Sequence, residues 1–320
     1  MCYINLIMKK LKIGVIGVGF FGRLHALTFK KIKEAEIVGI FDIDTKKAKE
    51  FSSQTGIPYF TSLKEILKRI EAVSICTSTS SHYQVAKTCL LNYKHCLVEK
   101  PLTQNYYEAK MLERLALNRG LFLQVGHIER FNSCFQAVRE RIKNPIFIET
   151  HRLNTYPYRS LDISVVLDVM IHDIDIVLGL VNSPLKRIEA IGVKILSSTP
   201  DIAQARLIFK NGCIANITSS RISNEVLRKL RVFTPSIYAS IDYKNQEGYI
   251  YQKSNAKIKR IPLKVEKEQS LYKELREFCL CCLNLKEPSF TLKEALESLR
   301  VALLVEKKIL NYEKTFLNLR

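Results

Sequence analysis

The segment from Lys12 to Gly126 limits the fold more than any other part of the chain, because short apolar, β-branched runs alternate there with helical patterns. The expected strands are "KIGVIGVG", "AEIVGIFD", "PYF", "AVSICTS", "HCLVEK" and "LFLQVGH". Helical stretches separate them, and one ends at Gly56, where glycine suits a left-handed C-cap. Strands that alternate with helices favour a parallel sheet with crossover helices. We therefore predict a doubly wound α/β domain of the Rossmann type over residues 1–126.

The rest of the chain, residues 127–320, has a different pattern. "IFIETHRLN" and "KRIEAIGVKIL" alternate, and Asn211-Gly212 joins two alternating runs in "ARLIFKNGCIANITSSRIS", which is a strong hairpin signal. "SIYASIDYKNQEGYIYQK" indicates a second hairpin, while "DISVVLDVMIHDIDIVLGLV" and roughly the last fifty residues indicate helices. These patterns predict a C-terminal α+β domain on a mainly antiparallel open sheet. We expect it to bind substrate and to oligomerise, with its last helices packed back on the first domain.

The chain is basic, with 50 Lys and Arg against 31 Asp and Glu and a net charge of +19. The lysines are scattered rather than gathered in one stripe, which argues against a nucleic-acid surface. An A/T-rich genome explains such a composition without selection on charge, and a phosphorylated substrate is the alternative. No run approaches the ~20 apolar residues of a membrane span.

The N-terminus and the cysteines indicate a cytoplasmic protein. "MCYINLIMKK" does not resemble a secretory signal, and Met8 is an alternative start. The nine cysteines lie mostly in apolar segments, as reduced core thiols do. Cys279, Cys281 and Cys282 lack the paired spacing of a zinc site, so we expect no metal.

The stretch "KIGVIGVGFFGRLH" contains a G-x-G-x-x-G motif at Gly17, Gly19 and Gly22. The motif lies between a predicted strand and a predicted helix, where it binds a pyrophosphate at the helix N-terminus. Asp42 follows twenty residues after Gly22, at the end of the next strand. A carboxylate there accepts hydrogen bonds from the ribose hydroxyls and repels a 2′-phosphate, which predicts NAD rather than NADP. The nearby Asp44 could take this place or cap the following helix.

Two separate segments carry candidate catalytic residues. Lys100 in "VEKP" ends the fifth strand, at the sheet edge where open α/β sheets do chemistry, although a solvated lysine is the alternative. Asp168 and His172 are four residues apart on an apolar helix and so share a face. A histidine there can act as a general base that a carboxylate orients, or it can be a core residue satisfied by Asp168. We expect structural or domain-contact roles for Asp173 and Asp175.

Several motifs together resemble the Gfo/Idh/MocA oxidoreductases over essentially the whole chain. They are the glycine motif with His25 after it, "CTSTSSHYQVAKTCL", "VEKPLT", "VGHIERFN" and "VLDVMIHDID". Within that family, "GHIERFN", "DVMIHDIDIVLGL" and "CIANITSSRIS" with "RKLRVF" are most similar to the UDP-N-acetylglucosamine 3-dehydrogenase group. That group makes a 3-keto nucleotide sugar that is later aminated for lipid A.

The resemblance implies an NAD-dependent oxidation in which Lys100, Asp168 and His172 surround a sugar hydroxyl. His172 would take the hydroxyl proton while Lys100 holds the oxygen, although family members differ on which of the two is the base. The expected cofactor-binding residues are Gly17, Gly19, Phe20, Phe21, Gly22, Asp42, Thr77, Ser78, His82, Glu99 and Lys100. "LDISVVLD" replaces the glycine-rich approach to the catalytic aspartate that many members have, which would reshape the pocket.

The residues for a substrate diphosphate are harder to choose. Arg152 and Arg159, with Tyr156 beside them, could grip phosphate oxygens. Other candidates are Arg221, Arg228 and Arg231, although an arginine run is usually a solvated face. His127 could contact substrate or cap a strand, and Glu129 and Arg130 could pair with each other.

The sequence leaves three points open, two on function and one on assembly. The first is a dehydrogenase of another polyol or sugar, such as an inositol or a UDP-uronic acid derivative. The second is an NAD-bound sensor without activity. The presence of all three candidate catalytic residues argues against it. The third concerns assembly, where we expect a homo-oligomer, either a dimer or a tetramer.

Overall fold

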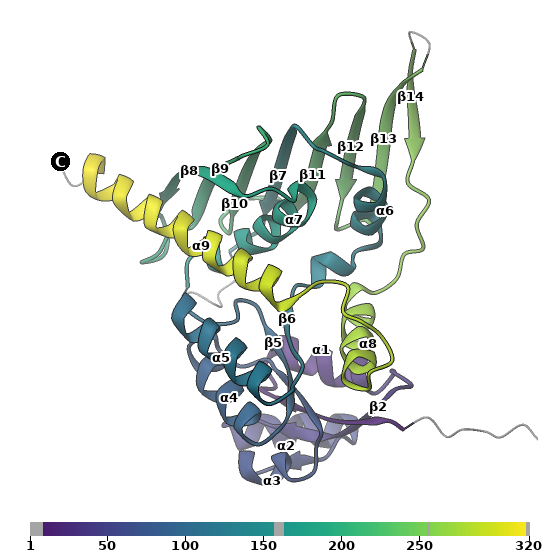
Figure 1. Ribbon diagram of the computed structural model, residues 1–320. Helices are drawn as coiled ribbons and strands as arrows, with labels where there is room; N and C mark the ends of the chain where they lie inside the picture. Colours follow the sequence, from purple (N-terminus) through teal and green to yellow (C-terminus); the bar gives the residue numbers. More distant parts are fainter. Residues whose placement is uncertain (1–8, 157–162, 255–256, 318–320) are drawn as a thin grey trace, which may run out of the picture. The chain divides into compact units, whose positions relative to one another are not determined.

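The computed structural model describes residues 9–156, 163–254 and 257–317, which form two compact units (Figure 1). One unit comprises Met1–Gly126 and Leu271–Leu292, and the other comprises His127–Ser270 and Lys293–Arg320.

The first unit contains a six-stranded parallel sheet in the order β3-β2-β1-β4-β5-β6. The strands are β1 (Leu11–Ile16), β2 (Ala35–Phe41), β3 (Tyr59–Phe60), β4 (Ala72–Ile75), β5 (His95–Glu99) and β6 (Leu123–Gly126). The crossover helices are α1 (Phe20–Phe29), α2 (Thr45–Thr55), α3 (Leu63–Leu67), α4 (Thr79–Leu91) and α5 (Tyr106–Asn118). The strand order reverses between β1 and β4, where doubly wound sheets bind ligands. The predicted Rossmann fold is confirmed.

Apolar residues from the strands and from distant helices form the core of this unit. Ile13 and Ile40 on the sheet pack with Phe29 of α1. The helix α8 (Ser270–Cys282) adds Leu275 and Phe278 to the same cluster, although it follows the sheet by about 150 residues of chain. The cysteine cluster of α8 is also buried, and burial raises the pKa of Cys279 to about 12 and that of Cys281 to about 11.

The second unit contains an eight-stranded sheet in the order β14-β13-β12-β11-β7-β10-β9-β8. Its strands are β7 (Phe147–Leu153), β8 (Leu185–Val193), β9 (Ile202–Phe209), β10 (Ile214–Ser220), β11 (Leu227–Phe233), β12 (Ile237–Asp242), β13 (Glu247–Ser254) and β14 (Lys257–Pro262). The pair β7–β10 is parallel and the other pairs are antiparallel, so the predicted mainly antiparallel sheet is confirmed. Asn211-Gly212 forms the predicted turn, with Gly212 at a φ of +89°. Strands β11 and β14 were not among the predicted strands.

Helices α6 (Ser133–Arg141) and α7 (Ile171–Val181) belong to this unit, as does the long α9 (Leu292–Tyr312), drawn in yellow in Figure 1. A 3₁₀ turn over Ile128–Phe131 precedes α6, and a π-helical turn over Glu313–Leu317 follows α9. The helix predicted from residues 162–181 differs from the expectation, because a π-helical turn over Val166–Met170 precedes α7. Such turns add a residue to a helix and occur frequently at functional sites. Within the described residues, no helix is long and apolar enough to cross a membrane.

Candidate active site

The glycine loop between β1 and α1 is shaped to leave its backbone exposed to a ligand. Gly17 has a φ of +88°, and a Cβ on Gly22 would lie 1.8 Å from the Gly17 carbonyl oxygen. Both positions therefore require glycine for the turn itself. A Cβ on Gly19 would instead meet no atom within 4 Å, so Gly19 faces open space at the start of α1. The loop thus has the form of a phosphate cradle at a helix N-terminus.

Asp42 and Asp44 have separate roles at the end of β2. Asp42 accepts hydrogen bonds from the backbone N–H of Val18, at 2.7 Å, and of Asp44, at 2.8 Å. Asp44 caps α2, since its Oδ1 accepts from Lys46 and Lys47. The structure therefore places Asp42 beside the glycine loop and leaves Asp44 with the helix. These contacts hold the Asp42 carboxylate at the edge where an adenosine ribose is expected.

The segment after β4 and the end of β5 are joined through His82. The Nδ1 atom of His82 lies 2.9 Å from the Pro101 carbonyl oxygen, and Nε2 lies 3.1 Å from the Thr77 carbonyl oxygen. Burial lowers the pKa of His82 against the effect of these contacts. His82 is thus a link between the two loops, and its contact with a cofactor stays a prediction. Thr77 is partly buried and Ser78 precedes α4.

Lys100 stands between two fixed residues. Glu99 before it forms an ion pair with the buried His25, with 3.1 Å between Nε2 and Oε1. Pro101 follows it through a cis Lys100-Pro101 peptide bond, and the Pro101 carbonyl oxygen contacts Nδ1 of His82. The end of β5 is therefore held on both sides of the candidate catalytic lysine.

In the second unit, Asp168 lies in the π-helical turn and His172 in the first turn of α7, and both side chains are half-buried. Ser164 begins this helical stretch, because its Oγ accepts from the backbone of Val166 and Leu167. Its hydroxyl donates to Glu306 of α9, and burial raises the pKa of that carboxyl. The start of the helix that carries Asp168 is thus fixed by side-chain hydrogen bonds.

Arg152 is buried in an ion-pair cluster rather than presented to a ligand. Its Nε and Nη2 donate to the two oxygens of Asp173 at 3.0 and 2.9 Å, and Nη1 donates to Glu129 at 2.7 Å. The ring of Tyr243 covers the guanidinium at 5.4 Å. Burial raises the pKa of Asp173 although Arg152 opposes this. With its donors engaged, Arg152 has a structural role here, and the predicted diphosphate contact is not supported.

A second buried cluster forms around Asp175. Arg130 donates to both Asp175 oxygens, from Nε at 2.6 Å and from Nη2 at 2.8 Å, and to Glu294 at 3.0 Å. Ser298 donates to Asp175 at 2.7 Å, and Nδ1 of His127 lies 3.7 Å from it. Burial would raise the pKa of Asp175, but His127 and Arg130 lower it. Both clusters agree with the structural roles expected for Asp173 and Asp175.

The predicted pairing of Glu129 with Arg130 is wrong. The two residues are neighbours in a 3₁₀ turn, where successive side chains diverge by about a third of a turn. Glu129 therefore reaches Arg152, while Arg130 reaches Asp175. Spacing alone did not show this, because the partners are 23 and 45 residues away.

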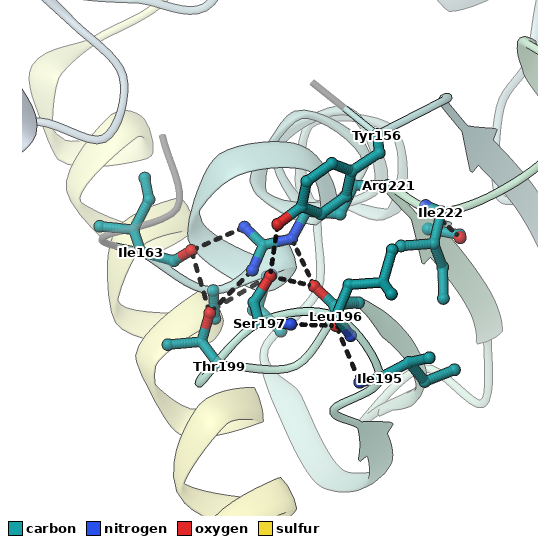
Figure 2. Close-up of polar contacts among 12 residues, drawn as sticks. Tyr156, Ile163, Ile195, Leu196, Ser197, Thr199, Arg221 and Ile222 are labelled. Atoms are coloured by element: carbon teal, nitrogen blue, oxygen red, sulfur yellow. Dashed lines mark hydrogen bonds and ion pairs between the residues drawn. The ribbon is translucent and has the colours of Figure 1, made fainter. Parts of the chain in front are cut away.

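Arg221 has no exposed surface and lies at the centre of the hydrogen-bond cluster shown in Figure 2. It donates to Asp201 at 3.0 Å, to the Ile163 carbonyl at 2.9 Å and to Thr199 at 2.8 Å. Asp201 also accepts from the Ser197 hydroxyl and from the backbone N–H of Ile195, Leu196 and Ser197, and these hydrogen bonds lower its pKa despite burial. Arg221 is therefore a structural residue too. Tyr156 lies at the edge of this cluster, with its hydroxyl 3.4 Å from Ser197 Oγ.

The other arginine candidates differ in their surroundings. Arg231 is partly exposed and donates to Glu149 at 2.8 Å. Arg228 is opposite Arg152 across β7 and β11, and burial together with that like charge lowers its pKa. The buried Nε of Arg228 has no hydrogen-bond partner. Arg159 lies outside the described residues.

Comparisons with known proteins agree with this architecture. The oxidoreductase family with an NAD-binding Rossmann fold matches residues 11–127, and the Gfo/Idh/MocA C-terminal domain matches residues 125–234. A UDP-N-acetylglucosamine 3-dehydrogenase from Acidithiobacillus ferrooxidans is 35% identical over 278 residues, which cover 85% of this chain and 88% of that relative. A solved structure of such an enzyme from the same organism has a TM-score of 0.89 at 33% identity, covering 94% of this chain and 98% of the other.

A more distant relative is a myo-inositol 2-dehydrogenase from Thermotoga maritima, 25% identical over 229 residues, which cover 66% of this chain and 69% of that protein. The family matches together span more than half of the sequence, and both domains of the family are present in order. This chain belongs to the Gfo/Idh/MocA family of NAD-binding oxidoreductases.

Proposed function

We propose that this protein oxidises the C3 hydroxyl of UDP-N-acetylglucosamine to a ketone, with NAD as the hydride acceptor. The main support is that the chain is 35% identical, over most of its length, to a dehydrogenase named for that reaction. Lys100, Asp168 and His172 are all present in the segments where the family resemblance expects catalytic residues.

The residues of the first unit fit a dinucleotide. Gly19 leaves open space in front of the N-terminus of α1, where backbone N–H groups can receive a pyrophosphate. Asp42 is held beside this loop, and its charge favours NAD over NADP. Ile43 next to it is 94% exposed and offers an apolar surface to an adenine ring. When bound, NAD accepts a hydride at nicotinamide C4.

We assign the proton of the reacting hydroxyl to His172 and its oxygen to Lys100. His172 takes the hydroxyl proton in this proposal, and the Lys100 ammonium stabilises the charge that develops on the oxygen. The reverse assignment of base is the alternative. Asp168, four residues before His172, orients the imidazole or tunes its charge.

For the diphosphate we propose Arg228, with Tyr156 and Arg159 as further contacts. Arg152 and Arg221 are committed to buried carboxylates, whereas Arg228 has a buried N–H without a partner. A half-buried guanidinium with an unpaired Nε–H is suited to a phosphate oxygen. His127 could contact the sugar, although it already lies beside Asp175.

The 3-keto product would be a substrate for amination on the route to lipid A. The eight described cysteines are free thiols, as in a reducing compartment. We therefore propose a cytoplasmic enzyme.

We also propose a homo-oligomer that pairs through the sheet face opposite α6 and α7. Four aromatic rings lie in adjacent register positions there, with centroids of neighbouring rings 4.6 to 5.5 Å apart, and each is half-buried. They are Phe147, Phe233, Tyr238 and Tyr251. Light scattering should give the mass of a dimer or tetramer, and Tyr238→Glu should lower it. Leu117→Glu, at an exposed leucine of α5, is the control that should leave the mass unchanged.

The activity test is formation of NADH from NAD and UDP-N-acetylglucosamine, with a transaminase and glutamate present to remove the ketone. We expect turnover, and we expect His172→Ala and Lys100→Ala each to reduce kcat by at least about a hundredfold. Turnover of an inositol or of a UDP-uronic acid instead of this sugar would refute the substrate. Undiminished turnover by both variants would refute the assigned mechanism, and absence of turnover with every sugar would favour a sensor.

A further inference from the structure

A buried histidine in the first unit connects the glycine-loop helix to the strand that ends at the candidate catalytic lysine. His25 of α1 has no exposed surface. Its Nδ1 lies 2.8 Å from Ser74 Oγ on β4, and its Nε2 lies 3.1 Å from Glu99 Oε1 on β5. One side chain thus bridges two adjacent strands from the helix that follows the cofactor loop.

The contacts of His25 determine its charge. Nε2 lies 3.1 Å from a carboxylate oxygen of Glu99, without hydrogen-bond geometry, and at this distance an ionised carboxylate favours the charged form of the imidazole. The titratable groups that face His25 are Cys76, just after β4, and Glu99. Burial would lower the pKa of His25, but these two groups raise it well above its usual value. The pKa of Glu99 is in turn lowered by His25, Lys100 and His82 against the effect of burial.

Glu99 is confined on its other side by β6. Gly126 is in register with Glu99, and a Cβ on Gly126 would lie 2.8 Å from Glu99 Oε1. The carboxylate therefore lies against the backbone of β6 and cannot move far from His25. Lys100 follows Glu99 directly in the chain, so the position of Glu99 sets where the backbone of Lys100 leaves the sheet.

We propose that His25 is a positioning residue, which as an imidazolium holds and neutralises Glu99 so that this carboxylate does not capture the Lys100 ammonium. The proposal rests on the proposed dehydrogenase function of Lys100. In a partly buried site an uncompensated carboxylate beside a lysine attracts it strongly. A lysine drawn toward Glu99 would be misplaced for a sugar oxygen, and small misplacements of catalytic groups are costly.

The first test does not depend on the reaction. NMR of the whole chain with ¹⁵N-labelled histidine should show His25 as an imidazolium at pH 7, where an ordinary histidine with a pKa of about 6.5 is mostly neutral. Glu99→Gln should return it to the neutral form at that pH. A neutral His25 at pH 7 in the wild type would overturn the proposal, whatever substrate the protein uses.

The second test uses kinetics with the nucleotide sugar. His25→Gln keeps a polar side chain at this position but removes the charge, so kcat should fall about tenfold to about a hundredfold while KM for the sugar changes by less than about twofold. The matched control is His95→Gln at the opposite end of β5, where Nδ1 accepts from the Phe122 N–H at 2.9 Å. This control should retain the wild-type kcat.

Ser74→Ala provides a second variant if His25→Gln does not fold. It removes the hydroxyl that orients the imidazole, so kcat should fall several-fold, again without a change in KM. An unchanged kcat in the folded His25 or Ser74 variant, or an equal loss in His95→Gln, would overturn the positioning role. If the wild type does not turn over any sugar, the proposed function fails, and the NMR result still decides the His25–Glu99 pair.

Discussion

Arg130 binds both carboxylate oxygens of Asp175, at 2.6 and 2.8 Å, and both side chains are almost completely buried. The pair joins the 3₁₀ turn of Ile128–Phe131 to α7, three residues beyond His172. The helix that presents the candidate base is therefore anchored to the second unit by a charge pair rather than by apolar packing alone.

Asp175→Asn should destabilise the second unit strongly, because it removes the buried carboxylate that binds Arg130 through both oxygens and leaves the guanidinium with the more exposed Glu294. Removing one partner of a buried pair costs about 3–5 kcal/mol in the free energy of unfolding. Urea denaturation followed by circular dichroism measures this. Glu189→Gln, which breaks the exposed pair with Arg187, should cost less than about 1 kcal/mol. Equal costs in the two variants would contradict the structural role of Asp175.

Gly19→Ala should weaken cofactor binding without loss of stability. Its Cβ meets no protein atom, but it would project into the space that a pyrophosphate is expected to fill. Gly22→Ala should instead lower the melting temperature, because its Cβ would collide with the Gly17 carbonyl. NADH titration by fluorescence and thermal unfolding separate the two effects. Normal NADH affinity in Gly19→Ala would contradict the position of the cofactor.

Asp42→Ser should move the cofactor preference toward NADP. The change removes the charge that repels a 2′-phosphate, and a tenfold shift in the ratio of NADH to NADPH affinity corresponds to about 1.4 kcal/mol. Asp44→Ser keeps a helix-capping oxygen and should leave that ratio unchanged, because Asp44 caps α2. A similar shift in both variants would argue against the assignment of Asp42.

The His25–Glu99 pair should stabilise the first unit over a defined pH range. The pKa of His25 is raised above 6.5, so its contribution is complete below that pH and is lost as the pH rises through the folded-state pKa. The pKa of Glu99 is lowered from 4.5, so its contribution is lost as the pH falls below that value. The stability difference between wild type and His25→Gln should therefore be greatest from about pH 5 to 6.5 and decline on either side. A difference independent of pH would contradict the ion pair.

Local patterns in the sequence predicted the sheets and the glycine loop well, because strand alternation and glycine spacing report on the backbone directly. The strand β11 was missed because "LRKLRVF" reads as an exposed arginine run, whereas Arg228 is half-buried opposite Arg152. The π-helical turn at Asp168 was missed as well, since an inserted residue leaves no distinctive mark in an apolar helix.

The site was harder to predict wherever partners are distant in sequence. Arg152 and Arg221 were plausible phosphate ligands as residue types, but burial commits them to Asp173 and Asp201. His25 was noted only as part of a family pattern, because its partners Ser74 and Glu99 lie 49 and 74 residues further along the chain. Ion-pair partners depend on the tertiary fold, which local periodicity does not specify.

Transfer of deuterium from the sugar to the cofactor measures directly whether hydride leaves C3 of the sugar, as we propose. UDP-N-acetylglucosamine with deuterium at C3 should be incubated with NAD and the purified protein, and the reduced cofactor analysed by mass spectrometry. We predict that the deuterium appears in the reduced cofactor, and that sugar deuterated at C4 gives unlabelled NADH. Unlabelled NADH from the C3-deuterated sugar, with turnover, would contradict the proposed reaction.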